Sequence, residues 1–227
     1  GLTEFLPVSS SAHVQIVSEL LQVPGLSDQN SATTAFIATI QLGTEAAVLI
    51  YFAKDIWRLI KAWGQGIFSK SKRAEQDYKL AWFVILASIP VGIAGLAFRN
   101  FVEETVRTLW VIAFTMIIFS VVLYLADRLG KKQKSIKELT FGSAMTFGLG
   151  QMLSLMPGVS RSGASISFGL FAGFKRADAA RFSFLIGIPA VLASGLLQFR
   201  DSYQNLDGAM LTGTIVATIA SFVVGYL

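Results

Sequence analysis

The chain lacks cysteine, has a single histidine and carries few charged residues. Without cysteine there can be no disulfide, no thiolate nucleophile and no cysteine-bound zinc ion. One imidazole, that of His13, cannot supply the two or three histidine ligands of a typical zinc site. Charged residues make up 15% of the chain and hydrophobic residues 53%, whereas a soluble domain has about 25% charged residues. We therefore expect one membrane domain over residues 1–227.

Long apolar runs give the fold class. A helix that crosses a bilayer needs about 17–25 mostly apolar residues, and this length predicts five spans: Thr33–Ala53, Leu80–Phe98, Leu109–Ala126, Phe182–Phe199 and Met210–Leu227. Three weaker segments accompany them. Leu2–Val23 is broken by a proline and serines, Leu139–Met156 is of span length but rich in glycine and serine, and Ser162–Phe174 is too short to span. The pattern predicts an all-α polytopic membrane protein.

Basic residues lie in short loops between the apolar runs, which argues against nucleic acid as the partner of a chain with net charge +5. Because lysine and arginine accumulate on the cytoplasmic side, we place the basic loops 54–79 and 127–138 inside. The less basic loops 99–108 and 200–207 then lie outside. The segment Leu139–Phe174 begins and ends inside, so it is predicted to form a helical hairpin with a polar turn at membrane depth.

The two halves of the chain resemble each other. Glu4–Ser10 and Ser154–Ser160 both place a proline three residues before a serine, and each is followed by a long apolar helix. The charge pattern gives these helices opposite directions. We therefore expect inverted-topology repeats, approximately 1–108 and 139–227, with two re-entrant helical hairpins whose tips meet. The chain begins without methionine and stops inside an apolar run, so we expect further residues at both ends.

Arg161 is the most informative residue of the second tip. A guanidinium binds phosphate bidentately, and the neighbouring hydroxyls and glycines can add donors and allow close approach. The candidate phosphate-binding residues are Gly158, Ser160, Arg161, Ser162 and Ser165. The alternative is that Arg161 pairs with Glu4 or extends to the membrane surface.

The first tip offers Glu4, Ser9, Ser10 and His13. A serine is a nucleophile when a base activates it, and histidine exchanges protons near neutral pH. Glu4 could hold Mg²⁺ or orient His13. The alternative for the serines is hydrogen bonding to helix backbone, which we favour for Ser9 taken alone. In the span 33–53, Gln41 can face the cavity, and Glu45 is interpreted as a structural partner across helices.

These motifs resemble a known family. Pro157–Ser165 is similar to the PGxSRSxxT signature of the undecaprenyl-diphosphate phosphatases, and Glu4–Ser10 with His13 resembles the end of their glutamate-rich first motif. Phe36–Gly43 also fits. The resemblance implies hydrolysis of a polyprenyl diphosphate lipid to the monophosphate carrier used in cell-wall synthesis, dependence on a divalent cation (Mg²⁺ or Ca²⁺), and bacitracin resistance.

The resemblance also implies roles and a location. Glu4 matches a metal-binding glutamate, Ser10 the nucleophile, His13 the proton-transfer residue, and Arg161 with the neighbouring serines the diphosphate-binding cluster. Ser9 and Gln41 are further substrate-binding candidates. The family's first glutamate would precede Gly1, and Ser165 replaces a threonine. The implied location is the bacterial inner membrane, with a site open to the periplasm. A homodimer, and a lipid flippase or transporter as the rival function, remain open.

Overall fold

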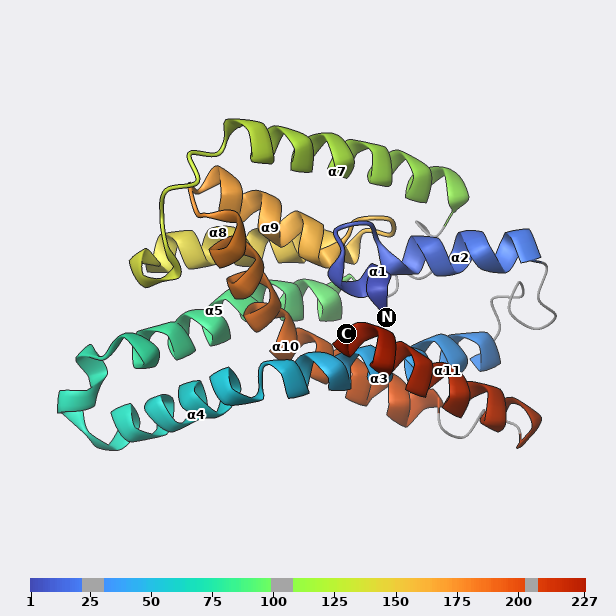
Figure 1. Ribbon diagram of the computed structural model, residues 1–227, viewed down its shortest axis with the longest axis horizontal. Coiled ribbons are helices and arrows are strands. Elements are labelled where there is room, and N and C mark those ends of the chain that lie inside the picture. Colours follow the sequence, from blue (N-terminus) through green and yellow to red (C-terminus); the bar gives the residue numbers. More distant parts are fainter. Residues whose placement is uncertain (22–30, 99–107, 203–207) are drawn as a thin grey trace.

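The computed structural model describes residues 1–21, 31–98, 108–202 and 208–227 (Figure 1). Within these ranges every regular element is a helix, and the only β-type pairing is an isolated bridge between Lys134 and Phe174. The all-α prediction is therefore confirmed. The expected outer loops 99–108 and 200–207 fall largely outside the described residues.

All five predicted spans are helices. They are α3 (Ser31–Tyr51), α5 (Gln76–Ala97), α7 (Leu109–Leu129), α10 (Arg176–Ser202) and α11 (Gly208–Tyr226). Among the described residues, α5 and α7 are long and apolar enough to cross a membrane. With 22 and 21 residues and a rise of about 1.5 Å per residue, they are ~33 and ~32 Å long, which matches a hydrocarbon layer of about 30 Å.

Helix α7 presents its apolar side chains to the surroundings. Only 11% of its most apolar 18-residue window is buried, and Trp110, Phe114 and Ile117 are 86%, 67% and 65% exposed. The core helix of a soluble protein would bury such residues, because each large apolar side chain gains about 1.5–3 kcal/mol on leaving water. An apolar helix with this exposure needs lipid around it, and the chain is a membrane protein.

The segment Lys54–Lys79 is not the loop that its basic residues predicted. It contains α4 (Ala53–Phe68) and a 3-10 helix, η1 (Lys70–Ala74). Leu59, Ala62 and Gly66 recur at helical spacing and are buried, whereas Lys54, Arg58 and Lys61 are exposed. Gly66 lets the ring of Tyr78 at the start of α5 pack directly against the α4 backbone. The segment is therefore an amphipathic helix, because its apolar residues form a stripe along one side.

Two pairs of short helices carry the polar turns. The first pair is α1 (Leu2–Phe5) and α2 (Ser10–Leu21), and the second is α8 (Phe141–Met152) and α9 (Arg161–Phe171). Short 3-10 turns, η2 (Ile136–Glu138) and η3 (Leu153–Leu155), flank α8. Leu139–Met156 was expected to be span-length, but α8 has 12 residues and α9 has 11. At ~18 and ~17 Å, neither helix crosses a bilayer alone.

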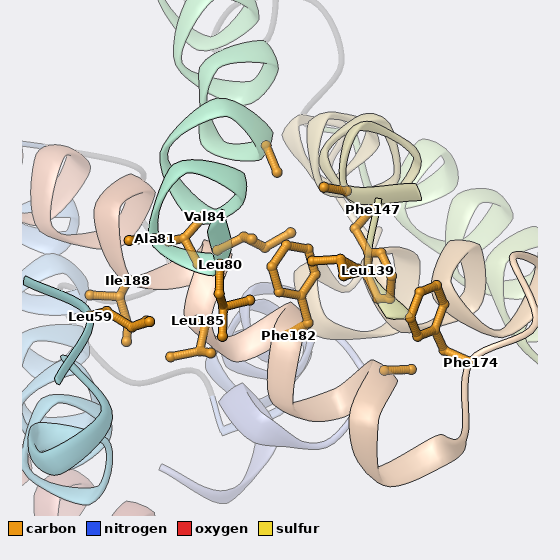
Figure 2. Packing of buried hydrophobic residues seen from close by; sticks show 14 of the residues in the cluster. Leu59, Leu80, Ala81, Val84, Leu139, Phe147, Phe174, Phe182, Leu185 and Ile188 are labelled. Carbon is orange, nitrogen blue, oxygen red and sulfur yellow. The ribbon is translucent and has the colours of Figure 1, made fainter. Parts of the chain in front are cut away.

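The core fixes the second hairpin against the long helices. Figure 2 shows the ring of Phe147 from α8 beside those of Phe174 and Phe182, and the ring centroids lie 5.4 and 5.0 Å apart. Gly148 brings the α8 backbone so close to Ala87 of α5 that a Cβ there would lie 2.3 Å from its carbonyl oxygen. Helix α10 runs obliquely between these elements and α3 (Figure 1). The α8–α9 turn is thus held firmly beside α10.

The first hairpin packs against the C-terminal helix α11. Helix α1 packs against α11, and a Cβ on Gly1 would lie 2.7 Å from the carbonyl oxygen of Ser221. Figure 1 shows the N- and C-terminal ends side by side near the middle of the molecule. Helix α11 in turn packs along α3. This arrangement brings Glu4 of α1 next to α3 and α10.

Candidate functional site

The two polar turns touch each other. Arg161 Nη2 donates to Glu4 Oε1 at 2.8 Å, across 157 positions of sequence. Ser162 Oγ donates to the Leu6 carbonyl at 3.4 Å, and a Cβ on Gly163 would lie 3.1 Å from Pro7 Cβ. The pairing with Glu4 is the one that the sequence left open as the alternative to phosphate binding. Because the pair borders a cavity, the two roles do not exclude each other.

The turn before α9 needs a glycine and is anchored on α7. Gly158 has φ +90°, and a Cβ there would lie 2.2 Å from Thr115 Oγ1. Thr115 donates to the Pro157 carbonyl at 2.6 Å. Ser160 caps α9 by accepting the N–H of Gly163 at 3.2 Å. These contacts place Arg161 in the first turn of α9.

The turn before α2 depends on Ser9. Ser9 is buried and has φ +61°, a left-handed conformation that costs a residue with a side chain about 1–3 kcal/mol. Its carbonyl oxygen accepts two hydrogen bonds from His13, one from the backbone N–H at 3.2 Å and one from Nδ1 at 2.9 Å. A carbonyl only accepts, so Nδ1 carries the proton, and the neutral ring has Nε2 as its acceptor.

Glu4 is the centre of the site. Its carboxylate accepts the hydroxyl of Ser10 through Oε2 and the guanidinium of Arg161 through Oε1. The side chain of Glu4 is 19% exposed and that of Arg161 30% exposed. The Ser10 hydroxyl therefore points at a carboxylate rather than at His13. A serine bound to a carboxylate and flanked by a guanidinium can attack an electrophilic phosphorus once that guanidinium binds phosphate.

Two cavities lie on either side of this contact. The carboxylate cavity is lined by Glu4, Thr44, Glu45, Arg161, Ser162 and Ser183, with apolar residues of α3 and α10. The histidine cavity is lined by His13, Gly158, Ser160 and Ser120, with apolar residues of α7 and the first hairpin. Of the predicted site residues, Glu4, Arg161 and Ser162 thus line one cavity, and His13, Gly158 and Ser160 line the other.

Three of the predicted substrate-binding residues, Ser9, Ser165 and Gln41, line neither cavity, and nor does Ser10. Ser165 is buried, donates to the Arg161 carbonyl at 2.8 Å and pairs with the hydroxyl of Ser183. It fixes α9 on α10. Gln41 is a half-buried residue of α3, and the part of α3 that lines the carboxylate cavity begins at Thr44.

Glu45 was interpreted as structural, yet it lines the carboxylate cavity together with Glu4 and Arg161. An acidic residue inside an otherwise apolar helix is the sequence signal that points to such a role. The sequence could not show which neighbour it faces, because that depends on how α3 packs beside α1 and α10.

The oxygen atoms that line the carboxylate cavity are suitable ligands for a hard divalent cation. Glu4 and Glu45 are joined there by the hydroxyl groups of Thr44, Ser162 and Ser183, so all the ligands on offer apart from the guanidinium are oxygens. Mg²⁺ and Ca²⁺ prefer oxygen ligands, and Mg²⁺ is often bound by one or two carboxylates plus substrate phosphate and water. No group of three or more acidic, histidine or cysteine side chains gathers within the described ranges.

Fold and site together define a helical membrane protein with a polar site between two broken helical segments. The chain belongs to the bacitracin resistance protein BacA family, whose model matches residues 1–227. It is 50% identical to an undecaprenyl-diphosphatase of Corynebacterium striatum, over 100% of this chain and 79% of that protein. An undecaprenyl-diphosphatase of Mycolicibacterium smegmatis is 49% identical over 100% of this chain and 80% of its own length.

Proposed function

We propose that this chain is an undecaprenyl-diphosphatase, a membrane phosphatase that hydrolyses undecaprenyl diphosphate to undecaprenyl phosphate and inorganic phosphate. The reaction recycles the carrier lipid for peptidoglycan synthesis. The whole-chain relatives carry this name, and the family's name ties it to bacitracin resistance. The observation that carries the proposal is the contact of Arg161 and Ser10 with the same Glu4 carboxylate at the wall of a cavity.

In the proposed mechanism, Arg161 and Ser162 bind the diphosphate. The guanidinium binds phosphate oxygens through parallel N–H donors, which orients the terminal phosphorus and spreads its charge. Arg161 already donates from Nη2 to Glu4 Oε1, so a phosphate that takes up both Nη groups in parallel competes with that carboxylate for the guanidinium. Substrate binding therefore releases the Glu4 carboxylate from its counterion.

Ser10 then attacks the terminal phosphorus, or holds the water that does so. Its proton passes to the carboxylate of Glu4, to which the hydroxyl already donates. The bond between the terminal phosphorus and the bridging oxygen breaks, and the lipid monophosphate leaves with the proton that Glu4 accepted. Where Ser10 has attacked, a water then hydrolyses the phosphoserine, which releases inorganic phosphate and restores the Ser10 hydroxyl. Where a water attacks directly, inorganic phosphate forms in one step. His13 lies on the other side of the contact, where the neutral Nε2 can exchange a proton with the histidine cavity.

Glu4 would hold the divalent cation, with Glu45 lining the same space. A bound Mg²⁺ or Ca²⁺ would supply positive charge that neutralises the diphosphate oxygens. The chain's own residues provide the rest: Arg161 clamps the phosphate, Ser10 supplies the nucleophile from its hydrogen bond with Glu4, and the apolar walls from α3 and α10 limit water.

The two hairpins and the site also have a proposed position in the membrane. We infer an inner-membrane protein in which the two hairpins are re-entrant halves of an inverted repeat, with the site opening to the periplasm and the isoprenoid tail lying in lipid or between helices. The short α8 and α9 and the two turns in contact support this placement, because irregular backbone at membrane depth must line a cavity or be covered by protein. A homodimer is compatible with it.

The test is phosphate release from undecaprenyl diphosphate by the purified full-length protein, with and without a metal chelator. We expect release that the chelator abolishes and that added Mg²⁺ or Ca²⁺ restores. Movement of the lipid across vesicles without hydrolysis would instead favour the flippase. Release that is indifferent to the chelator would remove the cation from the mechanism but leave the phosphatase in place.

A further inference from the structure

A buried polar atom next to the site has no partner. Gln151, in the last turn of α8, is fully buried, and its Oε1 accepts no hydrogen bond from the residues that the structure describes. Within the described ranges, the indole nitrogen of Trp63 is the only other buried side-chain nitrogen or oxygen in this state. A buried acceptor is rarely left unsatisfied, so an unpaired one calls for an explanation in function, water or a ligand.

The other end of the same amide is fixed. Gln151 Nε2 donates to the carbonyl of Ile186 in α10 at 3.3 Å. Turning the amide over would bring two acceptor oxygens together, so the hydrogen bond sets its orientation. Oε1 therefore points away from the Ile186 carbonyl, and the contact between α8 and α10 fixes this direction.

Arg161 and this oxygen both lie close to Gly187. A Cβ on Gly187 would lie 3.9 Å from Arg161 Nε and 3.9 Å from Gln151 Oε1, with no nearer atom outside its chain neighbours and its own helix backbone. The ion pair with Glu4 uses Nη2 of Arg161. The absence of a side chain at position 187 therefore leaves open space next to both a guanidinium N–H and an unsatisfied acceptor.

We propose that Gln151 is a positioning residue for Arg161. Its Oε1 accepts a hydrogen bond from Arg161 Nε–H, directly or through one water at Gly187, when the guanidinium turns its Nη atoms from Glu4 to the diphosphate. Gln151 fixes the plane of the guanidinium from behind, and the two Nη groups remain free for phosphate. This inference rests on the proposed phosphatase function, in which Arg161 is the diphosphate clamp.

The amide could also serve only to hold α8 on α10, and the chain offers a matched control for that role. Ser88 Oγ of α5 donates to the same Ile186 carbonyl at 2.9 Å. Ser88→Ala therefore removes a hydrogen bond from that carbonyl and leaves Gln151 Oε1 untouched. Gln151→Met keeps the length of the side chain and removes both of its polar atoms.

The experiment measures kcat and KM for phosphate release from farnesyl diphosphate by the full-length protein in detergent, with thermal stability measured for each variant. We expect Gln151→Met to lower kcat/KM about 10-fold and Ser88→Ala to stay within about twofold of the wild type. In an Arg161→Lys background, Gln151→Met should change kcat/KM less than twofold, because lysine has no Nε–H in a planar guanidinium.

Three results would overturn the inference: an unchanged kcat/KM for Gln151→Met, equal losses for Gln151→Met and Ser88→Ala, or the full 10-fold loss in the Arg161→Lys background. If Gln151→Met does not fold, Gly187→Ala takes its place, because the added methyl fits at 3.9 Å and fills the gap. An unchanged kcat/KM for Gly187→Ala also overturns it. Wild-type protein that releases no phosphate would refute the proposed function instead.

Discussion

Arg161 already has a partner when no phosphate is bound, since its guanidinium donates to Glu4 at 2.8 Å. The diphosphate must compete with that carboxylate, which a planar guanidinium can do because it offers several donors at once. We predict that Arg161→Lys lowers kcat/KM about 100-fold, since a lysine ammonium satisfies Glu4 but cannot bind two phosphate oxygens in parallel. Phosphate release from undecaprenyl diphosphate measures this.

The matched control is Arg58→Lys. Arg58 is an exposed arginine that also pairs with a carboxylate, that of Asp55, at 3.1 Å, and it lines neither cavity. We expect kcat/KM of this variant to stay within about twofold of the wild type. Equal activity for Arg161→Lys and Arg58→Lys would remove the bidentate clamp from the mechanism.

Ser10 and His13 make different contacts, which gives them separable roles. Ser10 donates to Glu4, whereas His13 is bound to the Ser9 carbonyl. We predict that Ser10→Ala lowers kcat about 1,000-fold and His13→Ala about 100-fold, since loss of a nucleophile costs more than loss of one proton-transfer group. Single-turnover phosphate release measures both, with Ser71→Ala in the exposed 3-10 helix η1 as the control.

The outcome for Ser10 also decides the attacking group. A Ser10→Ala variant that keeps more than a tenth of wild-type kcat would show that a water attacks the phosphorus and that the serine only holds it. A His13→Ala variant with full activity would leave the proton transfer to Glu4 alone.

At the scale of elements, the sequence predicted the long apolar helices but not the amphipathic helix α4. Each of the five long helices was predictable, because a run of about 20 apolar residues has few stable alternatives in lipid. Helix α4 was not predicted, since its lysines and arginines conceal an apolar stripe at helical spacing. The spacing of its apolar residues, rather than its mean hydropathy, identifies α4 as an amphipathic helix.

The meeting of the two polar turns was predictable from the sequence, and the contacts of individual residues were less so. Glu4, Ser10, Arg161 and Ser162 come together as the two related turns indicated. The pairing of Ser10 with Glu4, and the approach of Glu45, depend on the left-handed turn at Ser9 and on the packing of α3. Such geometry is set by tertiary contacts between segments far apart in the chain, and no local pattern encodes it.

The contact between the two turns is tight at one glycine, and this gives an element-scale prediction. A Cβ on Gly163 would lie 3.1 Å from both Pro7 Cβ and Ser160 Cβ, so Gly163→Ala must move the hairpins apart by a few tenths of an ångström. We expect about a 10-fold lower kcat/KM, because small displacements of reacting groups are costly. Gly142→Ala in α8 is the control, since a Cβ there meets nothing within 4 Å.

Phosphate release by the two alanine variants, with their thermal stability in detergent, checks this prediction. We expect Gly142→Ala to retain full activity and to be slightly more stable, by up to about 1 kcal/mol, because alanine favours helix more than glycine. A Gly163→Ala protein as active as the wild type would mean that the separation of the two turns does not limit the reaction.

The whole molecule makes sense only with lipid around it, because its large exposed side chains are mostly apolar. Trp110 in α7 is 86% exposed, whereas Trp63 in α4 is half-buried and its indole nitrogen is buried. In vesicles made with brominated lipid, we predict that a protein retaining only Trp110 loses most of its fluorescence. A protein retaining only Trp63 should lose much less, since bromine quenches indoles that it can approach closely. Equal quenching of the two proteins would contradict the assignment of α7 to the lipid-facing surface, and with it the membrane placement of the site behind that helix.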